Sequence, residues 1–494
     1  MKRSKFSLSN TKLLSCDMGE LVPCGLQEVL PGDTIQLSTS ALIRVSPLVT
    51  PVMHPVHARI VHFFVPHRLV WDNFENFITG GPDGNDATAH PVINMPAGGG
   101  AAVGSLADYL GVPTGVANLQ VSALPFRGYS LIWNEFFRDQ DLQIPVTINR
   151  GNGVDITTNT SLLRASWEKD YFTSSRPWTQ KGPQVQIPLG SSAPVVRVPS
   201  TTSTTPMKLR NASTDALLGP ATISSLANGD VTNGSGVLSI IDPNGRLQAD
   251  LSSAAGSTVS AFRTAMALNR FAEARARYGS RYTEYLRYLG VNTPDGKIDR
   301  PELLASGKQT IQFSEVLQTA EGTNAVGTLR GHGIGAVRSN RFRRYFDEHG
   351  FIFSFIVVRP KTIYANGLQR HWNRRVNEDY FQKELQFIGQ QEVLNKEVFA
   401  GHATPDGIFG YQDRYDEYRR SESTIAGEFR TTALDSWHMA RIFASQPALN
   451  AAFVECLPTK RIHSVQTNDV LYIMCYHNAQ ARRIVSKNAT PLVL

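Results

Sequence analysis

The chain has few of the residues that support redox, metal and membrane functions. It holds only four cysteines among 494 residues, Cys16, Cys24, Cys456 and Cys475, and none of them forms a CxxC pair. A structural zinc site or a disulfide framework is therefore not expected, and we interpret the four as reduced, buried thiols. The longest apolar run, residues 351–358, is far shorter than the ~20 residues of a membrane helix, so we expect no membrane segment.

Catalytic and metal-binding patterns are also missing. His54, His57, His62 and His67 cluster, but no nearby Cys, Asp or Glu completes a ligand set, and His57 and His62 would face opposite sides of one strand. We interpret them as structural histidines and predict no metal and no cofactor. The glycine-rich residues 331–335 lack the Lys-Ser/Thr of a phosphate-binding loop and are predicted to form a flexible crossing or a tight turn. No serine stands in a nucleophile elbow, so we predict no catalytic residue and no enzymatic activity.

Aromatic residues are absent from one long stretch. No Phe, Tyr or Trp occurs between Trp178 and Phe262, where Ser, Thr, Ala, Gly and Asn dominate. A segment this poor in large apolar groups cannot build much of a core by itself. We predict that residues 183–261 form a variable surface insertion within one domain spanning residues 1–494. A poorly ordered loop without a specific receptor is an equal alternative.

The remaining chain is typical of a β-rich fold. Residues 41–45 alternate between apolar and polar, residues 59–65 have apolar side chains on both faces, and residues 351–358 and 470–476 are predicted to be strands buried on both faces. These strands lie at opposite ends of the sequence, so a sheet that pairs them needs long connections, as in Greek-key and jelly-roll folds. Helices are predicted in the insertions, at residues 130–138, 262–276, 278–289 and 432–445.

The charge is mildly basic. The chain has 49 basic and 42 acidic residues, a net charge of +7, which is compatible with nucleic-acid contact without requiring it. Basic and aromatic residues interleave in places, as on proteins that bind single-stranded DNA without reading its sequence. Alternatively, these arginines pair with acidic residues at subunit contacts. The candidates for DNA contact are Lys2, Arg3, Lys5, Arg341, Arg343, Arg344, Arg370, Arg374, Arg375, Arg482 and Arg483.

Several motifs occur in the same order as in one known family. They include residues 28–37 (EVLPGDTIQL), 62–77 (HFFVPHRLVWDNFENF), 124–142 (LPFRGYSLIWNEFFRDQDL), 170–182 (DYFTSSRPWTQKG), 300–302 (RPE), 389–398 (GQQEVLNKEV), 409–418 (FGYQDRYDEY) and 434–438 (LDSWH). Together they resemble the major capsid proteins of the microviruses, small single-stranded DNA phages, and within them the gokushovirus branch. Phe136 stands where the family more often has Trp. The resemblance covers almost everything outside the aromatic-free stretch.

The resemblance implies a mainly β fold, a single eight-stranded antiparallel jelly-roll (viral β-barrel) with long helix- and loop-containing insertions. It further implies a virion protein, assembled in the bacterial host cytoplasm, of which sixty copies form a T=1 shell through pentamers around a circular single-stranded DNA genome. The insertion 183–261 would then rise as a protrusion near the threefold axes, with host attachment through an unknown receptor as one hypothesis. Aromatic residues suited to subunit interfaces, or alternatively to ordinary core packing, are Trp71, Phe74, Phe77, Trp133, Phe136 and Phe137.

The family also implies partners other than the chain itself. A net charge of +7 per copy is too small to condense a genome alone, so a small basic DNA-packaging protein is expected. An internal scaffolding protein and a DNA pilot protein are further expected partners. Competing hypotheses are a carbohydrate- or receptor-binding jelly-roll, a stand-alone single-stranded DNA-binding protein, and an enzyme of the cupin type. A sugar-binding module would need an aromatic platform, which the insertion does not contain. A DNA-binding protein would need a stronger charge excess than +7, and a cupin-type enzyme would need a compact His/Glu motif, which the sequence does not have.

Overall fold

The computed structural model divides into two compact units. Unit 1 comprises Met1–Thr179 and Arg275–Leu494, and unit 2 comprises Gln180–Ala274. The residues that the structure describes are 3–83, 85–183, 195–197, 210–211, 214, 223–225, 231–233, 239–240, 247–249, 259–278, 282–291, 294, 299–322 and 325–487.

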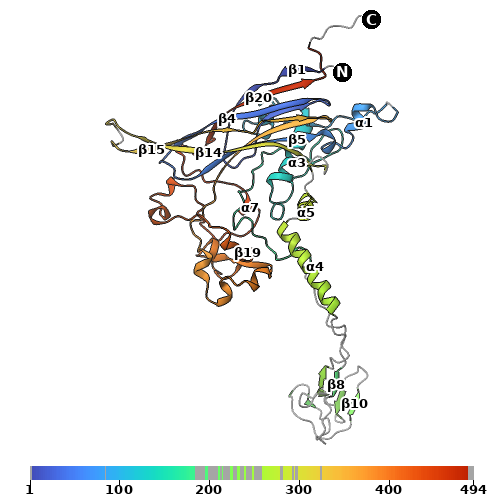
Figure 1. The fold of residues 1–494 in the computed structure, drawn as a ribbon, viewed down its shortest axis with the longest axis vertical. Helices are drawn as coiled ribbons and strands as arrows, with labels where there is room; N and C mark the ends of the chain where they lie inside the picture. The colour runs from blue at the N-terminus through green and yellow to red at the C-terminus, as the bar shows by residue number, and fades with distance from the viewer. Residues whose placement is uncertain are drawn as a thin grey trace. The chain divides into compact units, whose positions relative to one another are not determined.

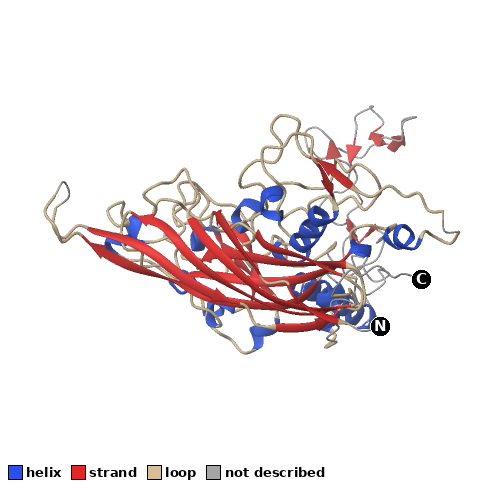
Figure 2. Cartoon of the chain, turned by 90° about the horizontal axis from the view of Figure 1, so that it is seen from above, coloured by secondary structure: helices blue, strands red, loops and turns tan. Residues whose placement is uncertain are grey.

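Unit 1 is built on one antiparallel sheet whose strand order is β1-β20-β4-β15-β14-β5-β17-β3. In addition, β2 pairs with β20 beside β1, and β16 pairs with β4 beside β15. Figures 1 and 2 show these strands side by side as one curved layer. Their bounds are β1 (Ser4–Ser7), β2 (Asn10–Cys16), β3 (Val22–Val29), β4 (Thr34–Leu48), β5 (Val56–Pro66), β14 (Glu302–Leu317), β15 (Leu329–Arg338), β16 (Phe342–Tyr345), β17 (Gly350–Pro360) and β20 (Leu471–Arg483).

This order is that of an eight-stranded jelly-roll. One half of the fold, which we call sheet I, has four strand positions: the first is shared by β1 and β2, the second is β20, the third is β4, and the fourth is shared by β15 and β16. The other half, which we call sheet II, consists of β14, β5, β17 and β3. The strand β14 belongs to both, because Glu302–Ile311 pairs with β5 and Gln312–Leu317 pairs with β15. Most neighbouring strands are distant in sequence, as the Greek-key connections of a jelly-roll require. The prediction of a mainly antiparallel β fold of the jelly-roll type is confirmed.

The two sheets enclose an apolar core. Ile43 on β4 and Ile473 on β20 face Ile60 on β5 and Ile356 on β17, and each is at most 3% exposed. All four cysteines are free and buried, as predicted. Because every second residue of a strand points to the same face, the inward positions of both sheets are apolar along most of their length.

Three glycines in β15 make room for the residues packed beside this strand. Residues 331–335 were predicted to be a crossing or a tight turn, and this is wrong: they lie within the strand β15. Gly331, Gly333 and Gly335 are its inward, buried residues, and a Cβ atom on Gly333 would lie 2.7 Å from Val45 Cγ2. Glycine here serves close packing between strands, and not flexibility.

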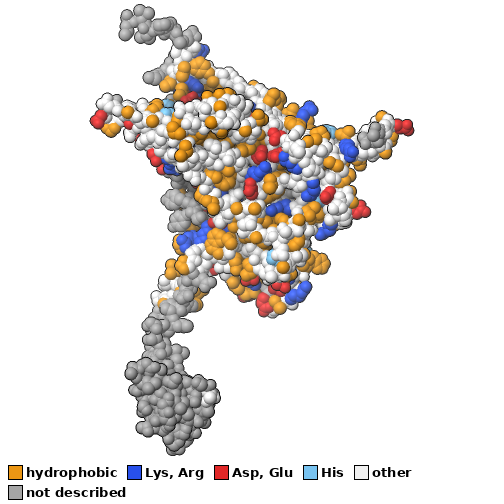
Figure 3. Space-filling view, turned by 180° about the vertical axis from the view of Figure 1, so that it is seen from behind, with side chains coloured by type: hydrophobic (Ala, Val, Ile, Leu, Met, Phe, Trp, Pro, Cys, Tyr) orange, Lys and Arg blue, Asp and Glu red, His pale blue; other side chains and the backbone are white. Residues whose placement is uncertain are grey.

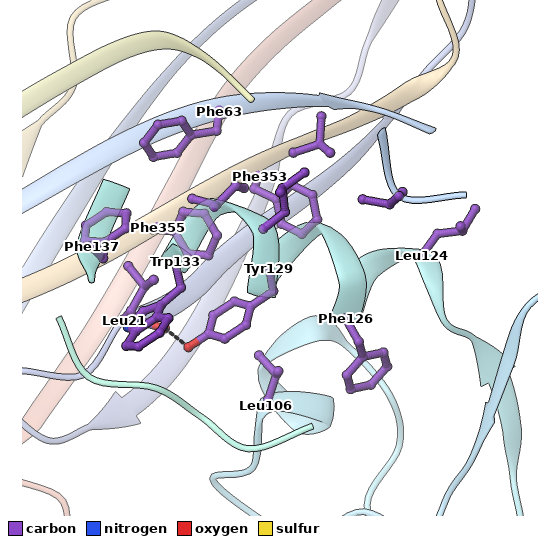
Figure 4. Packing of buried hydrophobic residues seen from close by; sticks show 14 of the residues in the cluster. Leu21, Phe63, Leu106, Leu124, Phe126, Tyr129, Trp133, Phe137, Phe353 and Phe355 are labelled. Carbon is purple, nitrogen blue, oxygen red and sulfur yellow. Dashed lines mark hydrogen bonds between the residues drawn. The ribbon is translucent and has the colours of Figure 1, made fainter. Parts of the chain in front are cut away.

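A second core covers the outer face of sheet II. Phe63 on β5 and Phe355 on β17 pack against Tyr129 and Phe137 from the insertion that follows β5 (Figure 4). The ring centroids of Tyr129 and Phe355 are 5.9 Å apart, and those of Phe63 and Phe137 are 6.1 Å apart. The Tyr129 hydroxyl donates a hydrogen bond to the Leu21 carbonyl at 3.1 Å. Sheet II is therefore buried on both faces, and residues 352–358 of β17 are all buried, as predicted for residues 351–358.

The insertion that carries this second core contains both helices and short strands. A helix, α3, is followed directly by a π-helical turn, Trp133–Phe137, so the predicted helix at residues 130–138 is confirmed in position but differs in its last turn. A buried ion pair between Arg127 and Asp155, with 2.8 Å between Nε and Oδ2, ties α3 to the loop after it. The elements are α1 (Phe74–Thr79), β6 (Val92–Asn94), α2 (Leu106–Leu110), β7 (Gln120–Ser122) and α3 (Leu124–Ile132).

The segment between β17 and β20 forms a smaller region with its own core. The two-stranded sheet of β18 and β19 packs with Tyr171, Phe172 and Tyr364. The helix predicted at residues 432–445 is wrong: only a single 3-10 turn, Asp435–Trp437, forms there. The elements are β18 (Gln390–Leu394), α6 (Asn395–Val398), β19 (Ile408–Asp413) and α7 (Ala451–Val454), with 3-10 turns at Arg370–Asn373, Asn377–Asp379, Glu384–Phe387, Asp416–Tyr418 and Gly427–Arg430.

Unit 2 contains most of the predicted insertion. Its short strands pair as three antiparallel ladders, β8 with β13, β9 with β12 and β10 with β11. The predicted helices at 262–276 and 278–289 correspond to α4 (Val259–Tyr278), which continues past the end of unit 2, and α5 (Tyr282–Tyr288) in unit 1. The strands are β8 (Val195–Arg197), β9 (Arg210–Asn211), β10 (Ile223–Ser225), β11 (Val231–Asn233), β12 (Ser239–Ile240) and β13 (Leu247–Ala249). The other residues of 184–258, except Thr214, lie outside the described part of the chain.

A chain of buried hydrogen bonds links the two sheets through the apolar core. On sheet II, the two ring nitrogens of His62 lie 2.8 Å from the Ser354 hydroxyl and 2.9 Å from the Ser339 hydroxyl. The Ser339 hydroxyl in turn accepts a hydrogen bond from the Thr39 backbone N–H on sheet I at 2.9 Å. His62 thus has both ring nitrogens satisfied although it is fully buried.

His477 continues this chain from sheet I back to sheet II. Its Nδ1 lies 2.8 Å from the Thr39 hydroxyl, and its Nε2 lies 2.9 Å from the carbonyl oxygen of Cys24 on β3. His57, by contrast, is half-buried and bonds to Thr310, so His57 and His62 lie on opposite faces of β5, as predicted. The buried histidines are therefore structural cross-links that require the neutral imidazole.

We expect the protein to lose stability as the pH falls below about 6.5. Burial lowers the pKa of five histidines, to about 3 for His62, to about 4 for His54, His67 and His463, and to a lower value for His477. In the unfolded chain the histidine pKa values are near 6.5, so below that pH the unfolded chain binds more protons than the folded chain. The free energy of unfolding therefore falls as the pH is lowered from about 6.5 toward the pKa values of the folded state. Urea unfolding at pH 7.5 and 5.5 should differ by about 1 kcal/mol for each histidine.

The matched variants are His62→Gln and His371→Gln, the second at an exposed histidine. The first should flatten the pH dependence and the second should leave it unchanged. An unaltered dependence in His62→Gln would contradict this account.

We also expect Gly333→Ala to destabilise the protein by about 1–3 kcal/mol, because the new methyl group overlaps Val45 and Phe313. Gly322→Ala is the control, since nothing lies within 4 Å of its added Cβ atom. Thermal unfolding of the two variants provides the measurement, and equal melting temperatures would show that the tight packing of Gly333 against β4 and β14 is not limiting.

Candidate nucleic-acid interface

The outward face of sheet I forms a continuous surface of paired side chains. Antiparallel partners share a face, so the strand register places Lys5, Arg482, Thr34 and Tyr345 in one row across the sheet. The next rows of outward partners are Ser7, Gln480, Gln36 and Arg343; Thr11, Tyr476, Ser40 and Arg338; Leu13, Met474, Leu42 and Ala336; and Ser15, Tyr472, Arg44 and Ile334. Figure 1 shows β1, β20 and β4 along the upper side of unit 1, away from α3 and α7.

This face is basic, and its outward positions carry no carboxylate, although Asp469 lies beside Ser15 and accepts a hydrogen bond from its hydroxyl. None of the outward partners in these rows is Asp or Glu, whereas six exposed cations lie on the face or beside it. Within the described ranges none of the six makes an ion pair. The six are Lys5, Arg44, Arg338, Arg341, Arg343 and Arg482.

Exposed tyrosine rings lie between these cations. Tyr472 is 47% exposed and Tyr476, four residues further along β20, is 44% exposed, and Tyr345 is 56% exposed at the end of the face. The guanidinium of Arg3 lies 5.6 Å from the centre of the Tyr345 ring and donates to the Gly32 carbonyl at 2.9 Å. The tyrosine rings therefore lie within a positively charged surface. Lys2, another candidate, lies outside the described residues.

Such a surface can hold a single-stranded nucleic acid. Lysine and arginine neutralise phosphates, and tyrosine rings offer faces on which bases stack irrespective of their identity. Alternate residues of one strand are about 6.8 Å apart and neighbouring strands about 4.8 Å apart, so the cations form a dispersed array and not one anion pocket. This geometry favours contact without sequence selection.

Other DNA-contact candidates are paired with acidic residues inside the subunit. Arg344 lies 3.1 Å from Glu302, and Arg483 lies 2.9 Å from the fully buried Asp33. Their charges are already balanced, so they contribute less to the field of the sheet I face.

A further set lies in the region around β18 and β19. Arg370 pairs with Glu397 at 2.9 Å, and Arg374 lies 3.7 Å from Glu417 and over the Tyr418 ring. Arg375 donates to the backbone carbonyls of residues 372 and 374. The structure therefore does not bring these three arginines together with the sheet I face. Whether any candidate touches DNA remains a prediction.

The aromatic candidates for subunit interfaces lie largely within the subunit's own core. Trp71, Trp133 and Phe137 are 0%, 5% and 8% exposed, and Phe74 and Phe136 are partly buried against the same core. Phe77 is 40% exposed and has surface to offer to a neighbour. A role at subunit contacts stays a prediction, and among the six Phe77 is best placed for it.

The sequence analysis missed part of the basic face. Residues 470–476 were predicted to be buried on both faces, but β20 alternates strictly between buried and exposed residues, which brings out Tyr472, Met474 and Tyr476. Arg44 and Arg338 were also missed, because each stands alone in its strand and not in a basic run. The alternation of residues 471–482 was the signal that could have found this face.

Charges elsewhere on unit 1 are mixed. Figure 3 shows acidic and basic side chains interspersed on the face that it presents. Lys308, for example, lies 2.7 Å from Glu168, which Arg359 also approaches. A basic face without carboxylates at its outward positions is thus a local property of sheet I.

Metal and membrane sites do not emerge from the described ranges. No group of three or more His, Cys, Asp or Glu side chains in these ranges could hold a metal ion. In the part of the chain that the structure describes, no helix combines the length and the apolar character needed to cross a bilayer.

Comparison with known proteins gives consistent results. The family model described as capsid protein (F protein) matches residues 1–491. Capsid protein VP1 of Bdellovibrio phage phiMH2K is 39% identical over 476 residues, covering 92% of this chain and 88% of the relative. Capsid protein VP1 of Chlamydia phage 1 is 32% identical, with 92% and 89% covered, and that of Spiroplasma virus 4 is 31% identical, with 92% and 87% covered.

We expect the combined change Lys5→Gln, Arg343→Gln and Arg482→Gln to weaken binding of a single-stranded oligonucleotide. Each lost phosphate contact should lower the slope of log affinity against log salt by about 0.7, so the triple change should lower it by about 2. Fluorescence anisotropy across a salt series measures both quantities with the full chain.

The control replaces three exposed cations outside the face, Arg150, Lys383 and Arg419, by glutamine. It changes the net charge equally and should leave the salt slope near that of the parent. If the slope of log affinity against log salt falls equally in both triple variants, binding depends on the net charge of the chain and not on the sheet I face.

Proposed function

Since the chain belongs to the capsid protein (F protein) family of phages, we propose that sixty copies assemble through pentamers into a T=1 icosahedral shell around a circular single-stranded DNA genome. The structural role in the virion and the microvirus-type identity follow from the family. Assembly in the bacterial host cytoplasm is part of the proposal. The family gives no reason to expect catalysis, and we propose none.

The observation that carries the proposal is the jelly-roll topology combined with large exposed apolar surfaces. Six large apolar side chains between residues 372 and 388 are 52–85% exposed, far more than a solitary subunit needs to display. Surfaces of this kind suit the contacts between copies, each of which buries on the order of 800 Å² per partner. The six are Trp372, Val376, Tyr380, Phe381, Phe387 and Ile388.

We assign the genome-facing side to the outward face of sheet I. Its unpaired cations and exposed tyrosines support contact with single-stranded DNA of any sequence. The ion-paired candidates Arg344, Arg370, Arg374 and Arg483 fit better as structural residues. Because +7 per copy is a small charge, a separate small basic packaging protein would supply the remaining neutralisation.

The insertion at residues 183–261 is assigned to a protrusion near the threefold axes with a role in host attachment. Its support is the helix α4, which begins at the end of the insertion and on which Phe262, Met266 and Phe271, which follow residue 261, are 44–46% exposed. Apolar side chains of this size on one helix are surfaces that neighbouring copies could cover. An internal scaffolding protein and a DNA pilot protein complete the proposed set of partners.

Sedimentation velocity on the purified chain tests the shell, with and without the scaffolding partner and checked by negative-stain microscopy. We expect pentamers or closed shells in at least one sample. Phe387→Asp together with Ile388→Asp should shift the distribution to smaller species, because both side chains are largely exposed and charges there would disrupt an apolar contact. Unchanged thermal unfolding of this variant would show that the fold is kept.

A monomer in every sample, across low and high salt, would refute assembly by this chain. Normal shells from the double Asp variant would instead refute the interface around residues 372–388 and leave the shell itself standing.

A further inference from the structure

A pocket with a polar lining lies in the region around β18 and β19. Its volume is about 150 Å³, and its walls come from residues 171–172, 364–374, 397 and 417–424. At about 30 Å³ per water molecule, this is room for about five waters, or for one small ring. None of its residues belongs to the sheet I face.

We propose that this pocket binds one monosaccharide residue, such as a sugar of a bacterial surface glycan. The inference does not depend on shell formation, because every group that carries it lies within one subunit.

The charges of the pocket balance, which indicates a neutral ligand. Three arginines, Arg370, Arg374 and Arg420, and three carboxylates, Glu397, Glu417 and Glu422, line the pocket, and Arg420 also pairs with Asp416 at 2.9 Å. The Arg370 guanidinium lies 2.9 Å from Glu397 and 3.6 Å from Glu417. An anion would meet carboxylates as well as arginines, and a cation would meet arginines as well as carboxylates, so neither charge is favoured. A ligand with many hydroxyl groups can accept hydrogen bonds from the arginines and donate to the carboxylates at once.

The polar groups of the pocket are built into the fold. Glu397 is 3% exposed, and its carboxylate accepts hydrogen bonds from Arg370 and from the Leu394 backbone N–H, both at 2.9 Å. Glu422 accepts a hydrogen bond from the Tyr171 backbone N–H at 3.3 Å. Both carboxylates are therefore held in fixed positions, as a specific site requires.

One buried hydroxyl group in the pocket is left without a regular hydrogen bond. Tyr171 is 3% exposed, and its hydroxyl lies near the side chains of Arg370 and Gln391 but makes no hydrogen bond of normal geometry with either. A buried polar group in this state calls for an explanation, and a ligand hydroxyl would satisfy it.

Aromatic rings complete the chemistry. Phe172 and Tyr364 line the same pocket with their ring centroids 4.8 Å apart in an edge-to-face contact. Apolar ring surface beside convergent polar groups is the usual composition of a small-molecule site, and it matches a sugar, whose C–H groups and hydroxyl groups point in different directions.

The test measures sugar binding by the full chain with saturation-transfer NMR and titration calorimetry. The probes are glucose, galactose, mannose, N-acetylglucosamine and rhamnose. A single sugar ring supports only a millimolar dissociation constant, so we expect at least one probe to bind in that range. Tyr171→Phe should weaken it about tenfold, because the change removes only the unsatisfied hydroxyl.

The control is Tyr476→Phe, which removes an exposed hydroxyl on the sheet I face and should leave sugar binding unchanged. Absence of binding by all five probes up to about 50 mM would overturn the proposal. Equal affinity of Tyr171→Phe and the parent would overturn it as well.

Assembled shells provide the last comparison. Binding by shells as well as by free subunits supports recognition of a glycan by the virion. Binding by free subunits alone would mean that a neighbouring copy covers the pocket, and that recognition would then be excluded. A chain that never assembles can still bind the sugar, so this test and the test of the shell fail independently.

Discussion

In unit 1, the strands β5 and β17 are buried on both faces, and other elements pack against one face or the other. Sheet I covers the inner face, and the insertion with α3 covers the outer face. A one-residue slip in register would exchange the two faces of these strands and so place each side chain in the wrong core. The buried hydrogen bonds of His62 and His477 then fix how the two sheets stand against each other, because each histidine has partners on specific strands.

Sheet I, unlike sheet II, is buried on one face only. Its other face is therefore available for binding. Its inward residues belong to the core, while its outward residues are free to carry cations and tyrosines without loss of packing. The region around β18 and β19 differs again, because its arginines and carboxylates neutralise each other around a pocket. The same subunit therefore separates a surface suited to a polyanion from a site suited to a neutral ligand.

Much of the fold could be predicted from the sequence, because strands buried on both faces, such as residues 352–358, have a distinctive composition. Errors arose where local pattern and tertiary context disagree. Residues 331–335 contain glycines that imply a turn, yet close packing against the adjacent strands and residues 50–51 requires them. Residues 432–445 have a helical pattern, but their backbone groups bond to residues far away, as Arg441 does with Ile363. The basic face could be predicted only in part, because its cations come from five strands and only the register brings them together.

The position of β20 has a consequence for synthesis of the protein on the ribosome. This strand is made late, yet it lies between β4 and the pair β1 and β2, which are made first. At about 5–20 residues per second, the first strands wait tens of seconds for their partner. Sheet I can therefore be completed only when residues 471–483 have left the ribosome exit tunnel, so unfinished chains lack its completed basic face. If this face contacts the genome as proposed, translation separates folding from that contact in time.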